Sequence, residues 1–225
     1  MAAATTISLP QLRAFCRDAF ERAGLSGPDS GTGAEVLSTT DAWGVFTHGS
    51  KALRGYLRRL QAGGLRARGR PGIVAEGPAW AVVDGDCSLG MVTSVFAMTT
   101  AIGKARRAGV GYVGVRNSSH FGAAGYYASL AARAGLIGLA MANDIPSVAA
   151  PGSRTAVTGS NPLAYAVPAA RHQPLMLDMS IATVAGGKVC VGQIPVIAGF
   201  WPTMSEEPGA AGLVWSLVRC AGWRP

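Results

Sequence analysis

Residues 111–127 read GYVGVRNSSHFGAAGYY, and the rest of the chain is organised around this stretch. Its first six residues are apolar and partly β-branched, which predicts a short buried strand over 111–116. Residues 123–134 predict a helix, so two serines and His120 fall in a strand-to-helix turn. Free backbone N–H groups and the positive end of the helix dipole suit an anion there, and a histidine moves protons near neutral pH. A capped helix with a hydrogen-bonded histidine is an equally good local interpretation.

The composition is that of a packed globular protein. The chain has 225 residues, of which 49% are hydrophobic and 14% charged, enough for one large domain or two small ones. No apolar run reaches the roughly 18 residues of a membrane helix, and residues 1–8 do not resemble a secretory signal. We therefore expect a cytoplasmic protein with no membrane partner. The widely spaced cysteines are typical of reduced thiols: Cys16, Cys87, Cys190 and Cys220.

The net charge of +8 comes mainly from arginines, six of which lie between residues 54 and 70. Nucleic-acid binding is one interpretation of such a cluster. The segment has no interleaved aromatic residue beyond Tyr56 and no nucleic-acid motif, so we favour a solvated helix face and expect no nucleic-acid partner. A positive field also suits anionic substrates and phosphorylated cofactors.

The residue pattern divides the chain into three parts. Residues 1–70 predict a helical N-terminal unit, with helices over 8–24, 29–43 and 50–60, the first opened by a capping box of Ser8 and Gln11. Residues 71–188 predict mixed strands and helices, and hence α/β class. Strands are expected over 79–84, 111–116, 136–142, 164–167 and 175–177, helices over 91–107 and 123–134, and a loop over 143–153.

Residues 109–114 match G-x-G-x-x-G by letters alone. A dinucleotide-binding fingerprint of that kind follows a strand and opens a helix. Here the motif follows a predicted helix and opens a predicted strand, which argues against a Rossmann-type site.

Four segments carry a resemblance to a known family: Thr47-His48-Gly49 with Tyr56, Ser119–Tyr127, Gly159–Pro162, and Leu177–Ser180 with Gly187-Lys188. In this order they resemble the motifs of the malate/L-lactate dehydrogenase family, over roughly residues 8–188. The resemblance implies a helical N-terminal unit, a non-Rossmann mixed-sheet cofactor domain over 71–188, and a homodimer. It also implies hydride transfer between NAD or NADP and a small 2-keto or 2-hydroxy acid.

The resemblance also implies catalytic residues. His48 is expected to act as acid/base, oriented by the Thr47 hydroxyl, and His120 to lie beside substrate and cofactor. Members of the family differ in which of the two histidines donates the proton, so that choice stays open. His172 lies in a polar turn and is expected at the surface.

Substrate binding is less well defined by the sequence. Family members carry an arginine four residues after the first motif histidine, where this chain has Ala52. Lys51 is the expected substitute, since it lies on nearly the same helix face as His48. Tyr56 and Ser160 are expected to contact substrate, although core packing explains Tyr56 equally well.

The cofactor is expected against the start of the helix after His120 and against two later segments. The predicted cofactor-binding residues are His120, Phe121, Gly122, Ala123, Ala124, Asn161, Asp178, Met179 and Ser180. For Asp178 the alternative is a helix N-cap. No His/Cys/Asp cluster has metal-ligand spacing, so no metal site is expected.

Residues 189–225 depart from the family pattern. They lack the Gly-Gly-x-Lys-Gly motif of full-length relatives, and only residues 212–219 have a weakly helical pattern. We expect a divergent tail with little regular structure, as a truncated or frameshifted gene would produce; a genuinely divergent C-terminus is the alternative. The alternative function is therefore a truncated, inactive remnant of the family, and weak activity is expected of these 225 residues.

Overall fold

The computed structural model describes residues 6–150, 152–182 and 213–218. It begins with the expected helical unit: α1 (Leu9–Arg22), α2 (Gly27–Ala42), the 3-10 turn η1 (Ser50–Ala52) and α3 (Leu53–Gln61). The capping box at Ser8 and Gln11 is present at the start of α1. The second helix begins two residues earlier than predicted, because Ser26 rather than Asp29 is its N-cap.

The remainder forms a seven-stranded mixed sheet in the order β1-β2-β3-β9-β4-β7-β8. Its strands are β1 (Gly72–Glu76), β2 (Trp80–Asp84), β3 (Val110–Arg116), β4 (Ile137–Ala142), β7 (Pro162–Val167), β8 (Leu175–Ser180) and β9 (Leu213–Val218). β2 and β3 run parallel, joined by the long helix α4 (Gly90–Ala108), and the other pairs are antiparallel. The G-x-G-x-x-G match over residues 109–114 therefore follows the end of α4 and runs into β3. This is the order expected for a fold that is not of the Rossmann type.

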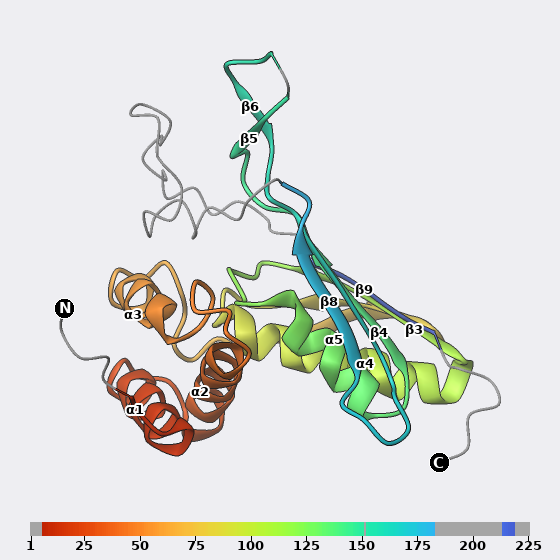
Figure 1. Cartoon of the computed structure of the whole chain (residues 1–225), viewed down its shortest axis with the longest axis horizontal. Coiled ribbons are helices and arrows are strands. Elements are labelled where there is room, and N and C mark those ends of the chain that lie inside the picture. Colours follow the sequence, from red (N-terminus) through yellow and green to blue (C-terminus); the bar gives the residue numbers. More distant parts are fainter. Residues whose placement is uncertain (1–5, 151, 183–212, 219–225) are drawn as a thin grey trace.

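Helices α4 and α5 (Ala124–Arg133) pack on one face of this sheet (Figure 1). Small or β-branched residues on alternate positions of the strands face these helices and are buried, as the period of two requires. The inward set in β2, β3, β4 and β7 is Ala81, Val83, Val113, Val115, Ala140, Ala164 and Ala166. Gly109 ends α4 with a φ of 85°, a conformation that favours glycine.

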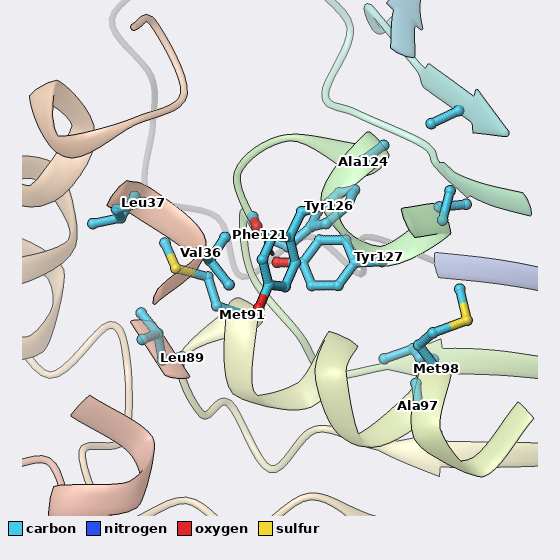
Figure 2. Close-up of a cluster of buried hydrophobic side chains, with 14 of the residues drawn as sticks. Val36, Leu37, Leu89, Met91, Ala97, Met98, Phe121, Ala124, Tyr126 and Tyr127 are labelled. Carbon is cyan, nitrogen blue, oxygen red and sulfur yellow. Dashed lines mark hydrogen bonds between the residues drawn. The ribbon is translucent and has the colours of Figure 1, made fainter. Parts of the chain in front are cut away.

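One hydrophobic core joins the N-terminal helices to the sheet-covering helices. Figure 2 shows Val36 and Leu37 of α2 close to Leu89 and Met91 at the start of α4, with Phe121 and the α5 tyrosines nearby. The Tyr127 hydroxyl donates to the backbone carbonyl of Phe121. This core fixes the segment that carries His120 against α2 and α4.

Three elements differ from the sequence expectation. β1 was not predicted, and it is an edge strand that pairs with one neighbour only. The predicted loop over 143–153 contains β5 (Val148–Ala149), which pairs with β6 (Ala156–Thr158) in a hairpin that projects from the body (Figure 1). The weak helix expected over 212–219 is wrong, because Leu213–Val218 forms strand β9 between β3 and β4.

The cause of the last difference is tertiary. The segment LVWSLV is rich in β-formers, and six of its residues pair with β3 on one side and β4 on the other. The rest of the predicted tail over 189–225 lies outside the described residues. Within the described part, no helix has both the length and the apolar character needed to cross a membrane.

Candidate active site

The two motif histidines, far apart in sequence, lie together in the fold. The rings of His48 and His120 stack with their centroids 5.6 Å apart and an interplanar angle of 24°. His48 comes from the loop between α2 and η1, and His120 from the turn between β3 and α5. The site therefore lies where the N-terminal helical unit meets the sheet domain.

His48 is half-buried and in contact with its neighbour. The Thr47 hydroxyl lies 2.9 Å from His48 Nδ1, as the sequence predicted. Burial lowers the pKa of His48 from its ordinary value, and the carboxylates of Asp178 and Asp144 oppose that shift. A neutral imidazole with two nearby carboxylates is suited to accept a proton at moderate cost.

The glycine that follows His48 packs closely against the carboxylate of Asp41. A Cβ on Gly49 would lie 1.8 Å from Asp41 Oδ1. Asp41 Oδ2 in turn accepts the Ser50 N–H at 2.8 Å, at the start of η1. The Thr47-His48-Gly49 motif thus fixes how the chain enters the η1–α3 segment.

His120 contacts Tyr56 of α3, which is only 3% exposed. The Tyr56 hydroxyl lies 2.5 Å from His120 Nδ1, and the ring centroids are 5.8 Å apart. Desolvation, the charge of His48 and the charge of Arg59 lower the pKa of His120 to about 4, against the opposing carboxylate of Asp144. His120 is therefore neutral at pH 7.

The backbone at His120 is fixed by the start of α4. Ser119 Oγ accepts the Gly90 N–H at 3.0 Å and so caps a helix whose own N-cap residue makes no side-chain hydrogen bond. A Cβ on Gly90 would lie 2.3 Å from the Ser119 carbonyl oxygen and 2.6 Å from that of His120. Only glycine permits this approach between two backbones.

A polar loop network adds a residue that the sequence did not indicate, Asp144. The Ser160 hydroxyl donates to Asp144 Oδ2 at 2.7 Å, and the Asp144 N–H donates to Asn161 Oδ1 at 2.8 Å. The Ser180 hydroxyl donates to the Ser160 carbonyl oxygen at 3.0 Å. Asp144 raises the pKa of both histidines, which places its charge near them. No motif spacing marks it, since its position depends on how loop 143–161 folds.

One backbone N–H at the start of α5 already has a carboxylate partner within the protein. Asp178 Oδ2, from β8, accepts the Gly125 N–H at 2.8 Å. A carboxylate of the protein thus lies at the positive end of this helix, where it disfavours a bound phosphate. Asp178 is not the N-cap of a following helix, as the alternative interpretation held, since it lies within β8 and its carboxylate accepts an N–H of the distant helix α5.

The remaining predicted site residues are either buried or exposed. Phe121, Gly122, Ala123 and Ala124 are buried, whereas Met179 is exposed. Lys51 is exposed and forms no ion pair within the described part of the chain.

Arg59, which the sequence assigned to a solvated face, is exposed, and its charge reaches the site. It adds to the burial and the His48 charge that lower the pKa of His120, and it opposes the burial that raises the pKa of Tyr56. Its spacing of three residues from Tyr56 on α3 could have indicated this position. His172 is exposed, as predicted.

Comparison with known proteins agrees with the motifs. The sequence profile of the malate/L-lactate dehydrogenase family matches residues 7–193. The malate dehydrogenase of Pyrococcus abyssi is 39% identical over 179 residues, which are 80% of this chain and 49% of that protein. The L-sulfolactate dehydrogenase of Methanocaldococcus jannaschii is 37% identical over 172 residues, 76% of this chain and 50% of that protein.

Among solved structures, malate dehydrogenase from Pyrococcus horikoshii OT3 superposes with a TM-score of 0.80 at 36% identity, over 82% of this chain and 53% of that chain. The chain spans about half the length of the curated relatives that it matches. The profile nevertheless covers most of the chain, and the paired histidines lie in its motifs. The chain belongs to the malate/L-lactate dehydrogenase family.

Proposed function

We propose that the chain carries the histidine pair of an NAD(P)-dependent oxidoreductase that interconverts a small 2-keto acid and its 2-hydroxy acid. The observation that carries this proposal is the stacked pair of His48 and His120. Relatives are named malate, L-sulfolactate and, in Escherichia coli O157:H7, ureidoglycolate dehydrogenase (NAD(+)). These names favour a dehydrogenase over an inactive remnant.

In the proposed chemistry His48 moves the proton of the substrate hydroxyl. Thr47 contacts Nδ1, which leaves Nε2 for the substrate oxygen. The carboxylates of Asp144 and Asp178 stabilise the imidazolium form that results. His120, neutral at pH 7, lies against His48 and would contact the same substrate.

The substrate carboxylate needs a cation, and two are available. Lys51 follows His48 in the first motif, and Arg59 acts electrostatically on His120 and Tyr56. An arginine offers two parallel donors, whereas a lysine offers a point charge. The Ser160 hydroxyl is a further substrate contact in this proposal, held in place by Asp144.

A nicotinamide cofactor would supply the hydride. In this proposal Asn161, Asp178, Met179, Ser180 and the accessible part of His120 would contact the cofactor, although the Gly125 N–H is already occupied by Asp178. Phe121, Gly122, Ala123 and Ala124 are buried, so their contribution would come through backbone atoms. We further propose a cytoplasmic homodimer, as the family resemblance implies.

Histidine substitutions test the proposal. Oxidation of NADH and NADPH is followed at 340 nm with a panel of 2-keto acids, for the parent chain and for His48→Asn, His120→Asn and His172→Asn. The first two variants should lose turnover by roughly a hundredfold or more, as expected when a positioned proton-transfer group is removed. His172→Asn is the matched control, since His172 is exposed in a turn, and it should retain the parent rate.

The substrate cation is tested in the same assay. Lys51→Ala or Arg59→Ala should raise KM for the keto acid more than it changes cofactor affinity.

Parent-like activity of His48→Asn or His120→Asn would remove that histidine from the mechanism.

A further inference from the structure

The hydroxyl of Tyr56 is committed to His120. Tyr56 lies on the inner face of α3, 3% exposed, with its oxygen 2.5 Å from His120 Nδ1. A phenol that donates to a histidine nitrogen has no second hydrogen to donate to a substrate. The contact links the N-terminal helical unit directly to the strand-to-helix turn, across 64 positions of sequence.

The donors around Nδ1 determine which ring nitrogen carries the proton. The Gly122 N–H points at Nδ1 from 3.4 Å, and a backbone N–H can only donate. Burial raises the pKa of the Tyr56 phenol above its ordinary value, so the phenol keeps its proton and can donate it. Because the Gly122 N–H already requires Nδ1 to be an acceptor, the Tyr56 hydroxyl donates its own proton to Nδ1. Both contacts require an unprotonated Nδ1, so the proton of a neutral His120 lies on Nε2.

We propose that Tyr56 is a positioning residue that holds His120 as the neutral Nε2–H tautomer, so that His120 donates a hydrogen bond to the substrate oxygen while His48 changes charge. This assignment rests on the proposed function. It separates the roles of two histidines that the sequence could not distinguish. It also moves Tyr56 from substrate contact to support of His120.

The surrounding charges agree with this division of roles. The charges of His48 and Arg59 both disfavour the imidazolium form of His120, and Asp144 is the opposing carboxylate. His48 faces two carboxylates, Asp144 and Asp178. Of two stacked imidazoles only one can be protonated at low cost. Because Asp178 acts on His48 in addition to Asp144, the proton is favoured on His48.

Nitrogen NMR of the imidazoles tests the tautomer without any need for turnover. The chain is labelled with ¹⁵N-histidine, and the three histidines are assigned by single His→Asn variants. We expect His120 to show a protonated Nε2 and an unprotonated, hydrogen-bonded Nδ1 throughout about pH 6 to 8. A proton on Nδ1 of His120 in the parent chain would overturn the proposal, whether or not the chain is active.

Tyr56→Phe removes the donor and keeps the ring. It should convert His120 to a mixture of tautomers and lower kcat by about tenfold, the equivalent of one hydrogen bond, with KM for the keto acid little changed. Tyr126→Phe is the matched control, since Tyr126 is 5% exposed and its ring contacts Trp43 and Tyr127. It should leave the His120 signals unchanged. A Tyr56→Phe spectrum identical to that of the parent would show that the tyrosine does not set the tautomer.

Discussion

Replacement of Gly90 by alanine should destabilise the fold and disturb His120 at the same time. The added Cβ would lie 2.3 Å from the Ser119 carbonyl oxygen, 2.6 Å from the His120 carbonyl oxygen and 2.9 Å from the Ser119 carbonyl carbon. All three are backbone atoms, which cannot rotate away as a side chain can. Overpacking of this kind costs about 1–3 kcal/mol. For a chain of this length the loss corresponds to a fall of about 2–12 °C in Tm.

Gly103, in the interior of the same helix, provides a control at which the same substitution should change stability in the opposite direction. A Cβ there would meet only Arg107 Nη1, at 3.6 Å, which is ordinary contact. Alanine is favoured over glycine inside a helix by about 1 kcal/mol, so Gly103→Ala should stabilise the chain. The same chemical change in α4 is therefore expected to shift stability in opposite directions at the two positions.

Urea unfolding followed by circular dichroism measures both variants against the parent. The Gly90→Ala midpoint should fall and the Gly103→Ala midpoint should rise, with unchanged slopes. A Gly90→Ala chain as stable as the parent would show that the backbone of residues 119 and 120 moves freely. The inference that α4 fixes His120 would then be wrong.

Two further predictions concern stability and local exchange. The pKa values of His48 and His120 are lowered from 6.5, so the folded chain binds fewer protons than the unfolded chain below that pH. The free energy of unfolding should thus have its full value above about pH 6.5 and decrease as the pH falls below that value. The decrease should be smaller in a variant that carries both His48→Gln and His120→Gln. Urea titrations that show the same pH dependence for the parent and this variant would contradict the prediction. Asp178→Ala removes the acceptor of Gly125 N–H, which should cost about 0.5–2 kcal/mol and speed amide exchange at the start of α5. Unchanged exchange at Gly125 would show that another group caps the helix.

Local patterns in the sequence determined most of the helices and strands. The Ser8 capping box and the glycine stop at Gly109 act within a few residues of the chain, so they can be read without a structure. The four motifs likewise predicted the family and the histidine pair. Each of these signals depends on residue types at fixed short spacing.

Tertiary structure alone decided how those parts act on one another. The insertion of β9 between β3 and β4 overrode a weak helical pattern, because pairing on both sides outweighs local preference in a six-residue segment. The hydroxyl of Tyr56 meets His120 across 64 positions, and Asp178 caps α5 across 53. No short-range pattern encodes such contacts, since they arise only when the core brings α3, β8 and the start of α5 together. The type of each side chain was set by the sequence, and its partner by the packing of the fold.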